Sequence, residues 1–160
     1  MRVGVSLLFS IAVVGCGYTF GSGLERLGVR TVSLDVVGND TFRQRLEAEL
    51  GQALARELPI STDVVLADRA TADARLHVVL TDANERTLVT GGRSDPVREG
   101  SFGAAVWMRL IARDGRVVLE RRVTDRTEFR SPIGEDLTSA RAELVKELAR
   151  KIALALADGF

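Results

Sequence analysis

The chain has 160 residues with 22 basic and 22 acidic side chains, and 46% of its residues are hydrophobic. This balance argues against a nucleic-acid-binding protein, because such a domain carries a basic face and a pI above about 9. A single histidine and a single cysteine are too few to build a zinc site or an internal disulfide.

The first sixteen residues have the pattern of an export signal. Arg2 supplies a positive start, Val3 to Val14 form an apolar run, and Gly15 precedes the only cysteine, Cys16. The run is too short to cross a bilayer, which takes about 20 apolar residues. An aliphatic residue, a small residue and a cysteine in this order resemble the lipobox of bacterial lipoproteins, which are cut before the cysteine and acylated on it. We therefore expect a removed signal peptide at 1–15 and a lipid anchor on Cys16; the alternative is a buried cysteine in an N-terminal strand or helix.

Downstream of this signal, the chain has the size of one domain. Loss of Arg2 leaves a formal charge of −1, and a chain of this length buries about two thirds of its unfolded surface. Gly17, Gly21 and Gly23 favour a flexible tether between lipid and domain. We therefore expect a lipidated N-terminus and tether at 16–28, followed by a single domain at 29–160.

The first predicted elements are a strand and a helix. Residues 29–37, VRTVSLDVV, are rich in β-branched side chains and predict a strand. Residues 38–41 break it and offer N-caps, with Gln44 placed after Thr41 as in a capping box. Residues 39–41 also match a glycosylation sequon, but their place at a helix start favours a structural role. The helix ends before Pro59, and its apolar face consists of Phe42, Leu46, Leu50, Ala53, Leu54 and Leu58.

Three further strands are predicted after a short one at 62–66. Residues 76–81 alternate between apolar and other side chains, as in a half-buried strand, and residues 91–100 then form a loop. Residues 102–113 and 116–129 flank Asp114-Gly115, a dipeptide suited to the positive φ angles of a type I′ turn, and predict a long hairpin.

The last predicted element is a long amphipathic helix that begins after Ser131-Pro132. Its apolar face consists of Leu137, Ala140, Leu144, Val145, Leu148, Ile152 and Leu156. The order strand-helix-strand-strand-strand-helix favours an α+β fold, in which two amphipathic helices pack on one face of a mostly antiparallel sheet of about four strands. The other face of that sheet is left open.

The sequence contains no recognisable catalytic or metal-binding pattern. His77 is the only histidine, lies within a strand pattern and has no nucleophile elbow nearby, which favours a strand-surface role. Asp63, Asp68 and Asp73 are five residues apart, unlike the ligands of a calcium loop, and indicate turn and surface positions. We therefore expect no enzyme activity, no metal and no cofactor.

Two short motifs and the order of elements resemble a known family. Cys16-Gly17-Tyr18-Thr19-Phe20 is followed by a strand, by the segment VGNDTF at a helix start, and by strands and a final long helix. This arrangement is similar to that of the lipopolysaccharide-assembly lipoproteins, LptE and its relatives. The resemblance implies a periplasm-facing, non-catalytic lipoprotein anchored in the outer membrane, whose domain plugs the large barrel LptD and aids insertion of lipopolysaccharide into the outer leaflet.

Charge is polarised along the chain in a way that suits such a role. Residues 86–130 hold 10 arginines against 6 acids, whereas residues 58–85 hold 2 basic residues against 5 acids. Guanidinium groups bind phosphates in a bidentate manner, so arginines in this region are candidates to contact lipid A phosphates or acidic groups of a barrel. The candidates are Arg86, Arg93, Arg98, Arg122 and Arg126. The alternative is codon bias, because the chain has 20 arginines but only 2 lysines.

Trp107 is a candidate partner contact, provided that it lies on the open face with Arg109 and Ile111, because tryptophan is enriched at interface hot spots. A second function class stays open on the sequence: an outer-membrane lipoprotein of similar fold that scaffolds another periplasmic complex, such as a cell-wall synthase regulator or a secretion component.

Overall fold

The computed structural model describes residues 23–35, 37–93 and 97–157. The expected signal peptide and the lipidation site, Cys16, lie outside these ranges. The elements, in chain order, are α1 (Gly23–Arg26), β1 (Thr31–Leu34), β2 (Gly38–Asn39), α2 (Leu46–Ser61), β3 (Val65–Leu66), β4 (Ala74–Thr90), β5 (Val97–Ala112), β6 (Val117–Arg130), the 3-10 helix η1 (Ser131–Ile133) and α3 (Leu137–Ala157).

One sheet organises the domain. Its strands lie in the order β3-β1-β4-β5-β6, and β2 also pairs with β4. The long strands β4, β5 and β6 are antiparallel, as expected, whereas β1, β2 and β3 are short and parallel to their neighbours. The sheet therefore has six strands rather than about four. Only β1 lies within the strand expected at 29–37. The additional strand β2 (Gly38–Asn39) lies where a break before the helix was expected, and it also pairs with β4.

The turn between β5 and β6 also differs from the prediction. Ala112 and Arg116 are joined by a backbone hydrogen bond, so the loop has three residues, and only Gly115 has a positive φ, of 87°. Asp114 instead accepts a hydrogen bond from the Arg116 backbone N–H through its side chain. A three-residue loop with glycine in the left-handed region is a common hairpin connection, so the hairpin is confirmed but its type I′ turn is wrong.

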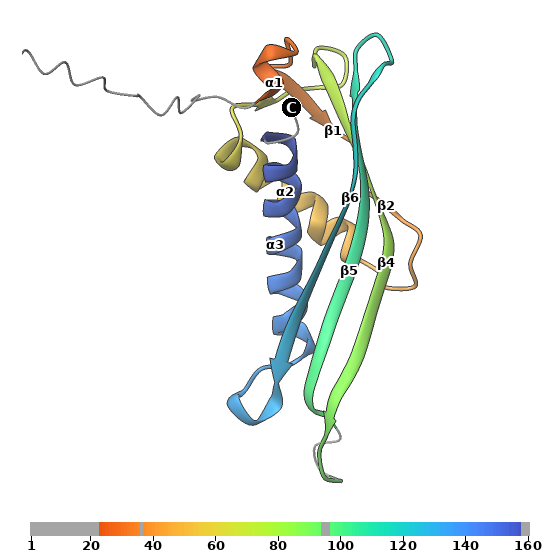
Figure 1. Ribbon diagram of the computed structural model, residues 1–160, viewed down its shortest axis with the longest axis vertical. Coiled ribbons are helices and arrows are strands. Elements are labelled where there is room, and N and C mark those ends of the chain that lie inside the picture. The colour runs from red at the N-terminus through yellow and green to blue at the C-terminus, as the bar shows by residue number, and fades with distance from the viewer. Residues whose placement is uncertain (1–22, 36, 94–96, 158–160) are drawn as a thin grey trace, which may run out of the picture.

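The helices cover one face of the sheet, as expected. In Figure 1, α2 and α3 lie on the same side of the long strands, and the other side carries no helix. Leu144, Leu148 and Ile152 of α3 are fully buried in the same core as alternate residues of the strands. These strand residues are Leu76, Val78 and Leu80 of β4 and Val106, Met108 and Leu110 of β5. Each such side chain contributes about 1.5–3 kcal/mol when it leaves water.

The start of α2 lies later than the sequence predicts. The helix begins at Leu46 after Arg45, which has a left-handed φ of 68°, and no side chain caps it, so the predicted capping box is wrong. Leu46, Leu50 and Leu54 form the buried face, whereas Phe42 precedes the helix and is fully exposed. The Asn39 side chain organises this segment instead, because it bonds Thr41 and the Arg43 carbonyl in the loop and Glu47 in the first turn of the helix.

The end of α2 also lies later than predicted. The helix continues through Pro59 to Ser61. Proline has a helical φ, but it removes one backbone donor and its ring crowds the carbonyl four residues earlier, so α2 carries this cost close to its end. Thr62 then closes the helix, because its backbone N–H and its hydroxyl both donate to the Leu58 carbonyl.

The described N-terminal residues pack onto the domain. Gly23–Arg26 forms a short helix within the segment expected to be a tether, and Leu24 is fully buried beside α3. This end of the sheet also carries the β5–β6 turn, whereas the Thr90 end of β4 lies far away at the opposite end (Figure 1). None of the described helices is both long and apolar enough to cross a membrane.

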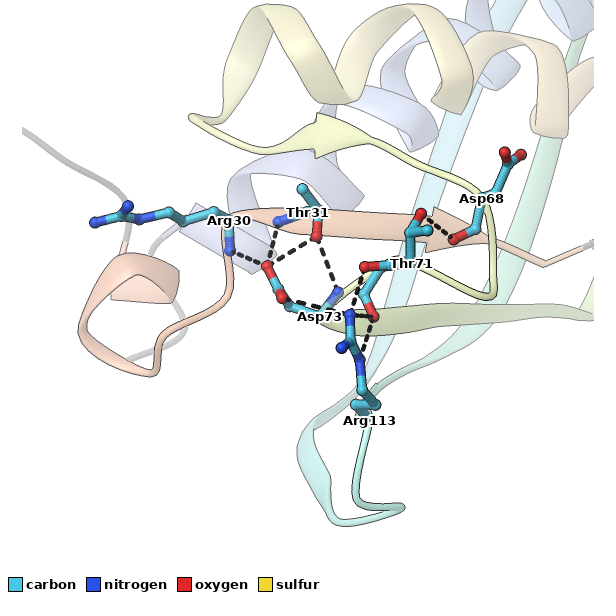
Figure 2. Close-up of polar contacts among 7 residues, drawn as sticks. Arg30, Thr31, Asp68, Thr71, Asp73 and Arg113 are labelled. Carbon is cyan, nitrogen blue, oxygen red and sulfur yellow. Dashed lines mark hydrogen bonds and ion pairs between the residues drawn. The ribbon is translucent and has the colours of Figure 1, made fainter.

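A polar cluster fastens the first strand to the centre of the sheet (Figure 2). Asp73 Oδ2 accepts hydrogen bonds from the Thr31 hydroxyl at 2.8 Å and from the backbone N–H groups of Thr31 and Arg30 at 2.9 and 3.1 Å. These hydrogen bonds hold the pKa of Asp73 below its ordinary value, and the bond from the Thr31 hydroxyl has the largest effect. Arg113 donates to the carbonyls of Thr71 and Ala72 from the far side. Asp73 thus lies at a bend before β4, as the sequence indicated, and its side chain in addition has a structural role.

Candidate functional site

The open face of the sheet is the candidate functional surface. Directly opposed residues of antiparallel strands point to the same face, so the register defines which side chains gather there. Three rows cross β4, β5 and β6 in turn: Asn84-Gly103-Arg126, Asp82-Ala105-Thr124 and Val79-Trp107-Arg122. The face therefore has bulky rims on β4 and β6 and a low floor on part of β5.

That floor produces a recess of about 450 Å³. Gly103 and Ala105 lie at its base, and β4 and β6 are about 10 Å apart across it because two strand spacings separate them. Its walls are Asp82, Asn84 and Arg86 from β4 and Arg122, Thr124 and Arg126 from β6. Three of the five arginines proposed from the sequence are thereby brought to one recess.

The three recess arginines have no partner within the described part of the chain. Arg86, Arg122 and Arg126 are exposed and form neither a hydrogen bond nor an ion pair there. Other arginines of the same face are paired, Arg109 with Glu120 at 2.9 Å and Arg130 with Glu99 at 3.9 Å. This recess, called the arginine recess below, therefore presents the three free guanidinium groups of Arg86, Arg122 and Arg126, whose planar donors match phosphate or carboxylate oxygens.

The other two candidate arginines lie elsewhere. Arg93 follows the end of β4 and is exposed, and Arg98 lies near the start of β5, where the pairing with β4 shifts register between Val89 and Thr90. Neither lines the recess. The fold therefore brings together three of the five candidate arginines: one of those near the loop, Arg86, and the two on the last strand, Arg122 and Arg126.

Trp107 lies on the open face together with Arg109, which was the condition for its role as a candidate partner contact. Its side chain is 46% exposed, and the Arg109 guanidinium lies 5.0 Å from the ring centroid. A smaller recess of about 180 Å³ adjoins it and is lined by Asp40, His77, Val79, Thr81, Trp107 and Arg109. His77 Nδ1 is 3.6 Å from Asp35, which confirms a strand-surface histidine.

A third recess, of about 200 Å³, lies near the β5–β6 turn and is lined by Ser33, Arg75 and Arg113, among others. Two of its three arginines are engaged: Arg75 Nε is 3.3 Å from an Asp35 oxygen, and Arg113 holds the carbonyls described above. The third, Arg69, has no partner among the described residues. The Ser33 hydroxyl is buried and has no hydrogen-bond partner. This end of the face is therefore built mainly from internal contacts.

Two features of the site were missed in the sequence. The floor depends on the small residues at 103 and 105, whose alternation along β5 was visible but whose effect depends on their neighbours in β4 and β6. Phe42 was assigned to a buried helix face and is instead exposed. No group of three metal-ligating side chains occurs within residues 23–35, 37–93 and 97–157.

Three solved structures show where this fold occurs. A minor lipoprotein from Acinetobacter baumannii matches with a TM-score of 0.54 and 14% identity, over 81% of this chain and 94% of that one. PelC, a dodecamer from Paraburkholderia phytofirmans, matches with a TM-score of 0.56 and 18% identity, over 81% of this chain and 89% of that one. A hypothetical protein from Chlamydia trachomatis matches with a TM-score of 0.55 and 11% identity, over 81% of this chain and 98% of that one. Identities this low establish a shared fold alone.

Sequence comparison identifies the family. Functionally curated proteins give no match. The family model described as LptE, lipopolysaccharide-assembly, matches residues 29–158, which includes the whole sheet, both long helices and the arginine recess. Because this match covers most of the chain, the protein belongs to the LptE lipopolysaccharide-assembly family.

Proposed function

We propose that the protein is a non-catalytic outer-membrane lipoprotein that plugs a large LptD-like barrel, assists its assembly and so aids insertion of lipopolysaccharide into the outer leaflet. The family match over residues 29–158 carries this proposal. In it, Cys16 bears the lipid anchor and the domain faces the periplasm. The open sheet face supports the proposal, since it offers a long surface with unpaired cationic groups.

The arginine recess indicates which kind of chemical group the protein contacts. Arg86, Arg122 and Arg126 line a recess together with two aspartates, Asp82 and Asp125, and the carboxylate of Asp125 is paired with Lys151. Such a site favours an anion with several oxygens, because each charge-assisted hydrogen bond is worth about 1.5–3 kcal/mol. Lipid A phosphates and acidic side chains of a barrel wall both have this chemistry. We propose that the recess contacts one of them.

Purification of the complex tests the function as a whole. The tagged full-length lipoprotein is isolated from gently solubilised envelopes, and the proteins recovered at equal stoichiometry are identified. One large outer-membrane barrel is the expected result. Recovery of a periplasmic enzyme or a secretion component in its place would reject the plug and favour the scaffold alternative.

Charge reversal tests the recess. Arg122→Glu combined with Arg126→Glu is compared with Arg56→Glu combined with Arg150→Glu, which makes the same charge change on the exposed side of α2 and α3. We expect the recess pair to weaken binding of purified lipopolysaccharide by about tenfold or more and the control pair to leave it nearly unchanged. Lipid A without its phosphates separates the two ligand chemistries: only phosphate contact predicts that it binds the native protein more weakly. Equal effects of both pairs would show that binding depends on the overall surface charge and not on the recess.

A further inference from the structure

Phe42 is exposed in a way that its environment does not explain. Four aromatic side chains of the Phe, Tyr and Trp type occur in the described residues, and two of them, Phe102 and Phe129, are buried. Trp107 is half-exposed, and Phe42 is fully exposed although the leucines that follow it in α2 are completely buried. An isolated exposed phenylalanine leaves its whole apolar surface in water, which costs about 25 cal/mol per Å² relative to burial.

The loop that carries Phe42 is held in one conformation. Asn39 Oδ1 accepts hydrogen bonds from the Thr41 backbone N–H at 2.9 Å and from the Thr41 hydroxyl at 2.7 Å. The Asn39 amide donates in turn to the Arg43 carbonyl at 3.0 Å and to Glu47 at 2.6 Å. The Thr41 hydroxyl also accepts from the Arg43 backbone N–H. The residues on both sides of Phe42 are therefore fixed by side chains.

Arg43 fastens the same loop to the sheet. Its guanidinium is 3.2 Å from Glu85 and lies over the Phe102 ring, 5.6 Å from the centroid. Hydrogen bonds from its own backbone N–H and from Asn39 keep the pKa of Glu47 below its ordinary value, so this acid stays ionised in the network near neutral pH. A loop ordered before binding loses little conformational entropy when a partner docks. The structure thus holds an apolar side chain rigidly in water.

The loop stands at the β4 rim of the open face. In Figure 1 the segment after β2 passes around the edge of β4 and projects on the side away from α3. Asp40, two residues before Phe42, lines the smaller recess together with Trp107. The loop that carries Phe42 therefore borders the same surface as the half-exposed Trp107, and this surface also carries the unpaired arginines at 86, 122 and 126.

We infer that Phe42 is a docking anchor that inserts into an apolar pocket of the protein partner lying along the open face. The inference rests on the proposed function and names the barrel wall as that partner. Charge complementarity supports a protein wall with acidic groups, since the three free arginines lie on the face that the Phe42 loop borders. Aromatic residues, phenylalanine among them, are enriched in the cores of protein interfaces, and a few residues there carry most of the binding energy.

Photo-crosslinking tests the anchor in the intact envelope. A benzophenone amino acid is placed at Phe42 and, as a matched control, at Ile60, an exposed apolar residue of α2. Phe42→Ala, Phe42→Trp and Ile60→Ala are made in the tagged full-length chain, and the recovered barrel is quantified. We expect a cross-link to the barrel from position 42 alone, and a loss of recovered barrel of about tenfold or more for Phe42→Ala. Phe42→Trp is expected to recover nearly as much barrel as the native protein does.

A second variant separates pre-ordering from the side chain. Asn39→Ala loosens the loop but keeps Phe42, and it should lower recovery of the barrel by less than Phe42→Ala does. Normal recovery with Phe42→Ala and no cross-link from position 42 would overturn the inference while leaving the proposed function intact, and so would a cross-link to lipid alone. Failure of the native protein to recover any barrel would overturn both.

Discussion

Lys151 of α3 and Asp125 of β6 join the helical layer to the sheet. The lysine Nζ is 2.6 Å from Asp125 Oδ1, and the aspartate side chain is only 13% exposed. Alternation along β6 turns Asp125 towards the helices, whereas its neighbours Thr124 and Arg126 face the recess. The pair therefore holds a β6 carboxylate on the helix side, where it does not neutralise the recess arginines.

Loss of this lysine should destabilise the domain. Lys151→Met leaves a mostly buried carboxylate without its cation, and we expect the free energy of unfolding to fall by about 1–3 kcal/mol. Asp125→Asn in the same background should recover part of the loss. Urea denaturation measures both, with Lys146→Met, an exposed change in the same helix, as the control. Equal effects of the two lysine variants would contradict a specific role of the pair.

Acid should weaken the fastening of β1 through Asp73. Since hydrogen bonds to the ionised carboxylate lower its pKa in the folded state, the stabilisation is present above the ordinary pKa of about 4 and is lost as pH falls through the folded value. Asp73→Asn should therefore lower the urea midpoint at pH 7 and make it less sensitive to acid. The control is Asp68→Asn, a turn residue whose side chain forms no hydrogen bond to any described residue. Parallel pH profiles for the two variants would argue against a role of Asp73 in acid sensitivity.

Two glycines of β5 should differ in how strongly alanine destabilises the domain. A Cβ at Gly100 would meet the Phe129 ring at under 3.0 Å, whereas a Cβ at Gly103 would come no closer than 3.4 Å to the Asp125 carbonyl oxygen. We expect Gly100→Ala to cost about 1–3 kcal/mol by overpacking and Gly103→Ala to cost less while it raises the recess floor. Thermal unfolding compares them directly. Similar unfolding midpoints would show that the Phe129 ring moves aside easily.

The Asn39 network should govern the entrance to α2. Asn39→Ala removes the acceptor for Thr41 and the donor to Glu47, and we expect a loss of about 1–2 kcal/mol together with faster amide exchange at residues 41–47. Asn84→Ala, which removes a single exposed hydrogen bond to Asp82, serves as the control. Exchange that rises uniformly over the whole domain would indicate global rather than local loosening.

Periodicity in the sequence was sufficient for the main architecture. Leu144, Leu148 and Ile152 lie on one helix face at a spacing of three to four residues, and Leu76, Val78 and Leu80 alternate as in a strand, so burial of these side chains dictates how each element faces the core. Local patterns carried less information where several groups compete for the backbone. At 39–45 the Asn39 side chain and a left-handed Arg45 replaced the expected cap, and Phe42 left the helix.

The arginine recess depends on a detail that no pattern in the sequence revealed. Up to Leu80 the even-numbered residues of β4 face the helices, but the register with β5 shifts between Leu80 and Asp82, after which Asp82, Asn84 and Arg86 face the open side. Without this shift, alternation would direct Arg86 towards the helices, away from Arg122 and Arg126. The sequence alone determined the α+β class, the hairpin and the helix faces, because each follows from local periodicity. Only tertiary structure decided which arginines meet, because that depends on register between strands distant along the chain.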